Sequence, residues 1–318
     1  MKRRYSLCGI TPRHVFCLLI VLMAPSLVVM AADGPEARSV EVFHVWPSEP
    51  PSWNAPSEAE KDSTPPDGGR TVAGKRVVRL TNVSHPRLHL YRASTTTPSD
   101  TVVLISPGGG YSILAWDLEG TEIAMRLAAS GIDAVVLKYR VPTRSEGDDK
   151  WVPAVQDIQR SVALIRAGKV TGRIPERVGA LGFSAGGNAT ARAATATERH
   201  YAATDLVDER VARPDFAALI YPAWLVEEAD RTQLIDGIHM DGDCPPMFLA
   251  HADNDRLTVH NSITLFSKLH DEGIPAALHV FTGSGHGFGG RDDGRADDHW
   301  IDLLVAWLGD MRADASLP

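Results

Sequence analysis

The feature that most constrains the fold is an alternation, from Thr101 onward, of short apolar segments with amphipathic helical segments. Apolar runs without polar alternation predict strands buried on both faces, and the helical segments between them predict parallel neighbours. The expected strands are residues 102–105, 134–137, 177–183, 216–221, 247–250 and 277–281, and the expected helices are residues 119–130, a helix opened by Pro153, and residues 260–271 and 298–311. The sequence therefore predicts an α/β domain whose mostly parallel sheet carries helices on both faces.

The segments before this alternation predict an edge and an arm. Residues 76–83 and 88–92 alternate apolar and polar side chains around a turn-like segment, which predicts an antiparallel pair at the N-terminal edge of the sheet. Residues 32–74 are rich in proline and glycine and show no sustained period, which predicts an irregular arm over the surface. We accordingly place the α/β domain at residues 75–318.

Residues 1–31 have the pattern of a secretory signal peptide. Basic residues precede an apolar run over residues 15–30, and Ala31 is a suitable small residue for cleavage after it. A membrane anchor is the alternative, but the run is interrupted by Pro25 and is shorter than the roughly 20 residues of a spanning helix. The sequence therefore predicts an exported protein, periplasmic or secreted, that is not held at a membrane after cleavage.

Charge and cysteine content limit the partners and the sources of stability. The chain has 32 basic and 40 acidic residues, a formal net charge of −8, and an acidic surface repels nucleic acid. Cys8 and Cys17 lie in the predicted signal peptide, so Cys244 alone would remain in the mature chain, as a buried thiol. Without an internal disulfide, stability has to come from a large hydrophobic core.

The segment Gly182–Gly186 carries a G-x-S-x-G pattern between a predicted strand and an alanine-rich helical stretch. A turn this sharp between a strand and a helix needs glycines where side chains would collide with the neighbouring strand. It also lifts its central residue clear of the sheet. Ser184 is therefore the candidate nucleophile, and an ordinary glycine-rich turn is the alternative.

A serine nucleophile needs a base and a group that orients that base, and parallel sheets gather such groups at the carboxyl ends of strands. His286, between two glycines, follows the strand predicted at 277–281, and Asp253 and Asp255 follow the strand predicted at 247–250. Asp253 and Asn254 form a natural turn pair, which gives Asp253 a local role. We therefore favour Asp255 over Asp253 as the residue that orients His286.

A glycine loop follows the strand predicted at 102–105 and can supply donors for an oxyanion. Consecutive glycines allow backbone amides to point inward, so the expected donors are the N–H groups of Gly109, Gly110 and Ala185, the residue after the nucleophile. A phosphate cradle is the alternative, but no Gly-Lys-Ser/Thr follows the loop. Tyr111, Tyr221 and Trp224 follow central strands and are the candidate substrate-binding residues.

Five motifs together resemble those of exported α/β-hydrolase esterases that act as acetyl xylan or feruloyl esterases. They are the loop 107–111, Leu137–Pro142, Gly182–Gly187, Tyr221–Ala223 and Gly285–Phe288, and the likeness spans residues 76–312. The chain order Ser, Asp, His agrees with this fold, and the family's His-Gly-x-x-Asp pattern aligns its acid with Asp255. The sequence departs from the pattern at Pro107, where lipase-like esterases carry histidine, and at Ala252, where glycine is usual.

The resemblance implies serine-dependent hydrolysis of carboxylic esters on xylan-type polysaccharide fragments, without a metal or organic cofactor. Acidic and histidine clusters at residues 241–243 and 297–299 do not have the spacing of a metal site. Two other functions stay open: a peptidase of the prolyl-oligopeptidase type, which usually has a large N-terminal propeller, and a catalytically silent binding module. A silent module would be expected to lack one of the three catalytic groups.

Overall fold

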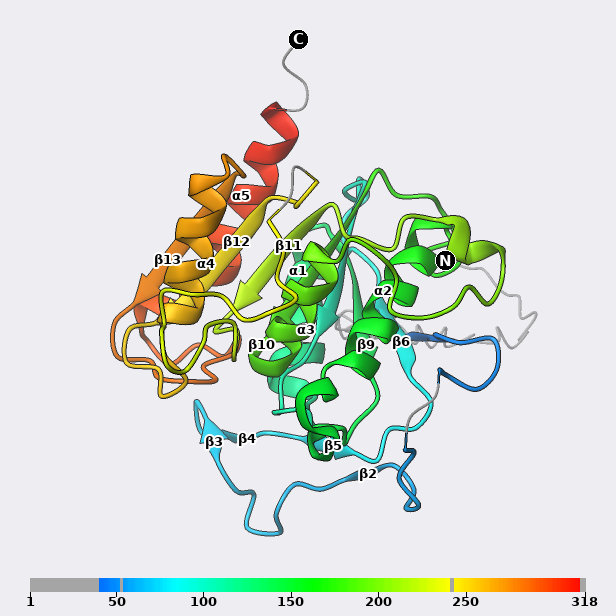
Figure 1. The fold of residues 1–318 in the computed structure, drawn as a ribbon, viewed down its shortest axis with the longest axis horizontal. Coiled ribbons are helices and arrows are strands. Elements are labelled where there is room, and N and C mark those ends of the chain that lie inside the picture. The colour runs from blue at the N-terminus through cyan, green and yellow to red at the C-terminus, as the bar shows by residue number, and fades with distance from the viewer. Residues whose placement is uncertain (1–39, 52–53, 241–242, 315–318) are drawn as a thin grey trace, which may run out of the picture. The chain divides into compact units, whose positions relative to one another are not determined.

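Eight strands form one central sheet, in the order β1-β6-β9-β7-β10-β11-β12-β13 (Figure 1). The computed structural model describes residues 40–51, 54–240 and 243–314, so the predicted signal peptide lies outside the described residues. The strands are β1 (Glu41–His44), β6 (Arg87–Tyr91), β7 (Thr101–Ser106), β9 (Asp133–Lys138), β10 (Arg177–Phe183), β11 (Phe216–Ile220), β12 (Met247–Ala252) and β13 (Ala276–Phe281). All neighbours from β9 to β13 are parallel, whereas β1 and β6 pair antiparallel at one edge. The predicted fold class is confirmed.

Helices cover both faces of this sheet. They are α1 (Glu122–Ala129), α2 (Val152–Arg166), α3 (Ser184–Thr195), α4 (His260–Asp271) and α5 (Trp300–Asp314), with shorter helical segments at Asp117–Thr121, Arg144–Asp149, Leu206–Glu209 and Ala296–His299. Side chains alternate along a strand, so Val102 and Leu104 pack in one core with α2 and α3, and Val103 and Ile105 pack in another with α1 and α5. A third cluster joins α3 and α4 to β11 and β12. The central strands are apolar throughout because both of their faces are buried.

The structure of the segment before β7 differs from two of the predictions. Residues 40–74 are not irregular throughout, because β1 joins the main sheet and the buried Trp46 donates a hydrogen bond of 2.8 Å to Asp157. The predicted pairing of residues 76–83 with residues 88–92 is wrong. Strand β5 (Arg79–Thr81) pairs with β2 (Lys61–Asp62) and β8 (Leu114–Ala115), and β6 pairs with β1 and β9.

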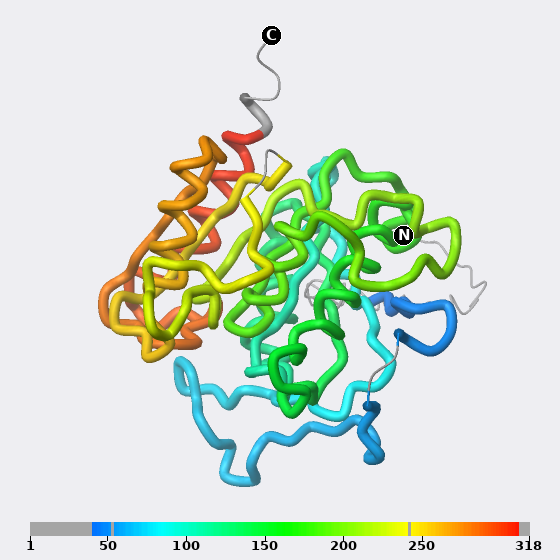
Figure 2. The backbone as a smooth tube through the Cα atoms, in the orientation of Figure 1, coloured from blue at the N-terminus to red at the C-terminus, as the bar shows by residue number. Residues whose placement is uncertain are grey.

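Alternation in so short a segment specifies a strand and not its partner. The consequence for the site is that β8 follows the glycine loop directly, so β5 lies beside that loop. Residues between β2 and β5 also form a small hairpin of β3 (Thr71–Val72) and β4 (Lys75–Arg76). The chain trace in Figure 2 runs from β1 through this segment, in blue and cyan, before it returns to the sheet at β6.

Candidate active site

Ser184 lies at the turn between β10 and α3, where its φ angle is +50°. This is the left-handed region, which residues other than glycine rarely adopt. A Cβ atom at Gly182 would overlap the side chain of Thr190, and one at Gly186 would overlap the carbonyl oxygen of Ser106. The turn therefore needs glycine on both sides of Ser184, as the sequence pattern indicated.

His286, in the loop after β13, connects Ser184 to an acid. Its Nε2 lies 2.8 Å from Ser184 Oγ, and its Nδ1 lies 2.7 Å from Asp255 Oδ2. Because an ionised carboxylate can only accept hydrogen bonds, the proton belongs on Nδ1, and Nε2 is left to accept from the serine hydroxyl. A general base for a serine nucleophile needs this tautomer. The ring of Tyr221 packs edge-on against the imidazole, with 5.1 Å between ring centroids.

Asp255 is buried and accepts three hydrogen bonds. Besides His286, its donors are the backbone N–H of Leu257 at 2.7 Å and Nε2 of His251 at 3.0 Å. Burial alone would raise the pKa of Asp255, but the hydrogen bonds from His251 and His286 outweigh it and hold the pKa well below its usual range. Burial also lowers the pKa of His251, whose Nδ1 lies 2.8 Å from Ser262 Oγ. Asp255 therefore faces His286 as a fixed negative charge.

Asp253 has a different position from Asp255. It is exposed, and its carboxylate accepts a 2.8 Å hydrogen bond from the backbone N–H of Gly283. The neighbouring Asn254 accepts a second one, also 2.8 Å, from the N–H of Gly285. The acidic turn after β12 thus holds the histidine loop through its backbone, while only Asp255 contacts the imidazole.

The glycine loop after β7 lies against the nucleophile. A Cβ atom at Gly108 would be 2.8 Å from Ser184 Cβ, and Gly109 and Gly110 have φ angles of +139° and +66°. Among the described residues, no acceptor lies within hydrogen-bond distance of the amides of Gly109 and Gly110. The N–H of Ala185, in the first turn of α3, has no acceptor within its helix. The amides of Gly109 and Gly110, proposed as oxyanion donors, thus belong to residues that line one pocket with Ser184 and donate no hydrogen bond to the described backbone.

Glu119 is a buried site residue that the sequence analysis did not find. It lies in the short helical segment before α1, where its Oε2 accepts a 2.7 Å hydrogen bond from the N–H of Gly108. Its Oε1 accepts a 3.0 Å hydrogen bond from the hydroxyl of Tyr221, which itself accepts from the N–H of Gly289. Burial raises the pKa of Glu119. Glu119 thereby fixes the first glycine of the loop and, through Tyr221, the backbone after His286.

Replacing Glu119 by alanine should lower kcat by roughly 10²-fold, an effect comparable to losing one oxyanion donor. The buried N–H of Gly108 would lose its acceptor, which should also cost about 1–3 kcal/mol of stability. Glu119→Gln keeps one oxygen acceptor for the N–H of Gly108, and its NH₂ group can donate to the hydroxyl of Tyr221. It should retain kcat to within about tenfold, because the contact with the loop needs the acceptor and not the charge. Steady-state kinetics and thermal midpoints of both variants check this, and equal losses of kcat in the two would contradict it.

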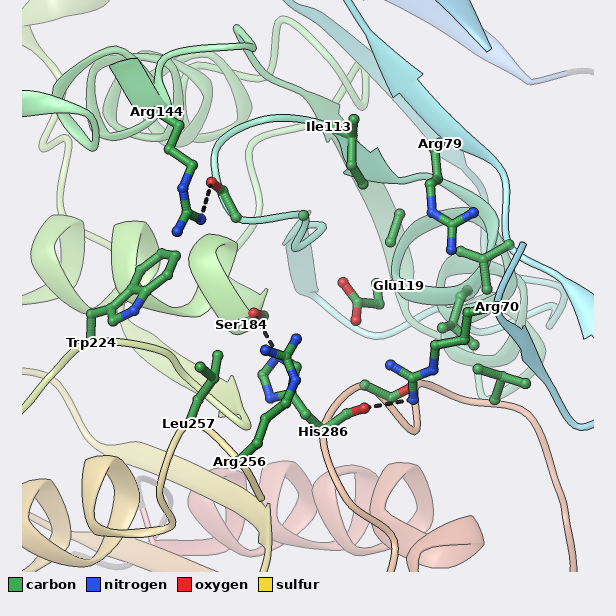
Figure 3. Close-up of a pocket in the computed structure, with 17 residues that line it drawn as sticks. Arg70, Arg79, Ile113, Glu119, Arg144, Ser184, Trp224, Arg256, Leu257 and His286 are labelled. Carbon is green, nitrogen blue, oxygen red and sulfur yellow. Dashed lines mark hydrogen bonds between the residues drawn. The ribbon is translucent and has the colours of Figure 1, made fainter. Parts of the chain in front are cut away.

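A pocket of about 470 Å³ opens above Ser184 and His286 (Figure 3). Of the three aromatic residues predicted to bind substrate, the structure places only Trp224 on its wall. Tyr111 and Tyr221 are fully buried and have to be reassigned as supporting residues. The ring of Tyr111 stacks against that of Trp224, with centroids 6.0 Å apart, and its hydroxyl donates to Asn188. Their place after central strands buries these two tyrosines beneath the site instead of exposing them to it.

Four arginine side chains line the same pocket, and the sequence analysis found none of them. They are Arg70 and Arg79 from the N-terminal segment, Arg144 after β9 and Arg256 after β12. In Figure 3, Arg70 and Arg79 lie on the side of Glu119, and Arg144 lies beside Trp224. These residues are distant in sequence and share no pattern, so only the fold brings them together.

In the described part of the chain, no group of three or more histidine, cysteine, aspartate or glutamate residues has an arrangement that could hold a metal ion. None of the helices in that part combines the length and apolarity needed to cross a membrane.

Comparison with known proteins shows to which class of proteins this fold and site belong. The architecture is that of the α/β-hydrolases. The sequence profile of Peptidase_S9, the prolyl oligopeptidase family, matches residues 154–313, and the chain belongs to this family.

A curated relative is an acetylxylan esterase from Xylanibacter ruminicola, which is 27% identical over 240 residues. The match covers 68% of this chain and 47% of the relative, so the chain spans about half the length of that protein. Among solved structures, an acetyl ester-xyloside bifunctional hydrolase from Caldicellulosiruptor lactoaceticus superposes with a TM-score of 0.60 at 27% identity, over 72% of this chain and 89% of the other. A thermophilic esterase from Thermogutta terrifontis shares the fold at 22% identity, with a TM-score of 0.58 over 76% and 91% of the two chains.

Proposed function

We propose that this protein is a serine carboxylester hydrolase that removes acetyl or other acyl groups from xylan-type polysaccharide fragments. The observation that carries the proposal is the hydrogen-bonded chain from Ser184 Oγ through His286 to Asp255, with distances of 2.8 and 2.7 Å. A serine becomes nucleophilic when an oriented imidazole takes its proton, and this geometry provides that imidazole. The catalytic groups are therefore Ser184, His286 and Asp255.

In the first half of the reaction, Ser184 Oγ attacks the ester carbonyl as its proton passes to His286 Nε2. Asp255 stabilises the imidazolium that forms, since its carboxylate stays ionised. The N–H groups of Gly109, Gly110 and Ala185 supply the hydrogen bonds for the developing oxyanion. His286 then gives its proton to the leaving alcohol oxygen, the ester bond breaks, and the acyl group remains on Ser184.

In the second half, His286 takes a proton from water, which attacks the acyl carbon on Ser184. The tetrahedral intermediate collapses, the carboxylic acid leaves, and the proton returns to Ser184 Oγ. Each proton transfer uses the same Nε2 atom, so the tautomer fixed by Asp255 serves both halves. The steps require only groups of the chain and a water molecule.

The substrate class is supported by the relatives and by one wall of the pocket. The relatives at 27% identity carry the names acetylxylan esterase and acetyl ester-xyloside bifunctional hydrolase. Trp224 is half-buried on the pocket wall, and the part of its ring that Tyr111 and Arg144 leave uncovered can contact the apolar face of a sugar ring. We infer that the natural substrate is a small ester or acylated oligosaccharide.

A peptidase is the second candidate because the family is named for prolyl oligopeptidases. The esterase is favoured because the relatives at 27% identity carry the names acetylxylan esterase and acetyl ester-xyloside bifunctional hydrolase.

A panel of purified substrates tests the proposal. We expect release of acetate from acetylated xylo-oligosaccharides, a lower rate on feruloyl esters, and no measurable cleavage of proline-containing peptides. Cleavage of the peptides with no hydrolysis of any ester would reverse the assignment. The same panel with a chelator checks that no metal ion takes part.

We also propose export of the protein, with removal of residues 1–31, from the basic and apolar pattern described above. The mature chain would then begin at Ala32. N-terminal sequencing of the protein from a culture supernatant or periplasmic fraction tests this, and an intact Met1 in those fractions would contradict it.

A further inference from the structure

The hydrogen bonds that hold two of the pocket arginines are accepted by neutral groups. Arg70 donates a 2.7 Å hydrogen bond to the carbonyl oxygen of His286, and Arg144 donates one of 3.2 Å to that of Gly110. Arg144 also lies over the ring of Trp224, 5.3 Å from its centroid. Among the described residues, none of the four forms an ion pair with an acidic side chain. Arg70 interacts electrostatically with Glu119, and the pocket as a whole keeps an excess of positive charge.

Arg79 and Arg256 retain unused donor capacity. Nη1 of Arg79 is buried and has no hydrogen-bond partner among the described residues, although a buried guanidinium nitrogen normally has one. The side chain of Arg256 is exposed, and no hydrogen bond of its side chain to any described residue is present. Leaving a charged donor of this kind unsatisfied is costly, which is a reason to expect an anionic ligand here.

The charge of this pocket is opposite to that of the protein. The chain has a net charge of −8, yet four arginines line the pocket against one carboxyl group, Glu119. Burial raises the pKa of Glu119, and both of its oxygens are already engaged, by the N–H of Gly108 and the hydroxyl of Tyr221. A cleft lined by one sign of charge concentrates ligands of the other sign and increases their association rate.

We propose that the preferred substrate carries a carboxylate on its sugar part, as a uronic acid residue does, and that Arg256 binds this carboxylate while Arg79 adds positive charge from the side of Glu119. Guanidinium groups match carboxylate geometry with paired N–H donors. The inference rests on the proposed function, because it specifies the ester that the same site hydrolyses.

The position of Arg256 indicates that the carboxylate of the substrate belongs to its sugar part and not to its acyl group. Arg256 is exposed while Ser184 is buried. A small acyl group bound to Ser184 has little reach, whereas the sugar extends past the nucleophile to the mouth of the pocket. Figure 3 shows Arg256 beside His286, so the acidic group would be recognised next to the nucleophile.

The test compares two matched substrates. One is an acetylated xylo-oligosaccharide that bears a uronic acid, and the other is the same compound after reduction of its carboxyl group to a primary alcohol. We expect kcat/KM to be at least about tenfold higher for the acidic substrate, since one charge-assisted hydrogen bond accounts for such a ratio. The ratio should fall toward one at about 1 M NaCl, where charges are screened within about 3 Å.

Variants assign the preference to the arginines. Arg256→Gln and Arg79→Gln should each lower the ratio severalfold, and the matched control Arg210→Gln, an exposed arginine outside the pocket, should leave it unchanged. The quantity compared is the ratio of kcat/KM for the acidic substrate to kcat/KM for the reduced substrate. A change in rate that is common to both substrates therefore cancels. If circular dichroism shows that Arg79→Gln does not fold, the ratio measured for Arg256→Gln alone tests the inference, because Arg256 is exposed.

The outcomes separate this inference from the proposed function. Hydrolysis of both substrates at equal kcat/KM, or an unchanged ratio in Arg256→Gln, overturns the inference and leaves the esterase intact. A preference for p-nitrophenyl hemisuccinate over the butyrate ester, without one for the uronate, overturns the placement on the sugar. No hydrolysis of any ester, p-nitrophenyl acetate included, overturns the proposed function itself.

Discussion

Replacing Ser184 by alanine is expected to lower kcat for ester hydrolysis by about 10⁶-fold, as removal of the nucleophile does in another serine hydrolase. The hydroxyl that lies 2.8 Å from His286 Nε2 is the only atom removed, and the backbone conformation at φ +50° suits alanine no worse than serine. The variant should therefore fold normally. Measurement of kcat on an acetylated substrate, together with the thermal midpoint, checks both statements.

A serine remote from the site provides the control for this variant. Ser130, exposed at the end of α1, should be replaceable by alanine with no change in kcat. A phosphonylating reagent should label Ser184 in the wild type and not in a His286→Ala variant, because only the imidazole activates the hydroxyl. More than a tenth of the activity remaining in Ser184→Ala would eliminate this residue as the nucleophile.

Replacing Asp255 by asparagine should lower kcat by about 10⁴-fold. The amide would no longer enforce a proton on His286 Nδ1, so Nε2 would lose its role as the acceptor of the serine proton. Asp255 also accepts from His251, so we expect a stability loss of about 1–3 kcal/mol in addition. Measurement of kcat at a temperature well below the midpoint separates the two effects.

The matched control is Asp253→Asn, two residues away in the same turn. An asparagine oxygen can still accept the 2.8 Å hydrogen bond from the N–H of Gly283, so kcat should change by less than about threefold. Loss of catalysis in a folded Asp253→Asn variant, with activity retained in Asp255→Asn, would show that the wrong acid has been assigned.

The fold and the positions of the three proposed catalytic groups were accessible from sequence because each depends on local pattern. Apolar strands, a strand-turn-helix motif around Ser184, and polar residues at strand ends are all short-range signals. Parallel topology then brings the strand ends to one edge of the sheet. The choice of Asp255 over Asp253 rested on the turn formed by Asp253 and Asn254 and on a resemblance. In the structure, the carboxylate of Asp255 accepts a hydrogen bond from the imidazole of His286, whereas that of Asp253 accepts one from the backbone N–H of Gly283.

Other residues of the site are brought there by contacts between segments distant in sequence, and no local sequence pattern predicts them. Glu119 reads as an ordinary residue of an amphipathic helix, yet it is fixed by contacts with Gly108 and Tyr221. Arg70 and Arg79 come from a segment predicted to be surface arm or edge strand. Arg79 reaches the pocket because β5 pairs with β8, and Arg70, just before β3, donates to the carbonyl oxygen of His286. Which strand pairs with which cannot be decided by a three-residue strand alone.

Four residues around the pocket, Tyr111, Ser184, Tyr221 and Trp224, have positive φ angles although none is glycine. Each such conformation costs on the order of 1–3 kcal/mol and persists only when the surrounding core imposes it. Sequence optimisation for thermostability would favour glycine or asparagine at these positions, and every such exchange would remove either the nucleophile or an aromatic support. These four residues therefore lower the stability of the folded protein but cannot be replaced without loss of the site. Substitutions that raise the melting temperature have to be made elsewhere in the molecule.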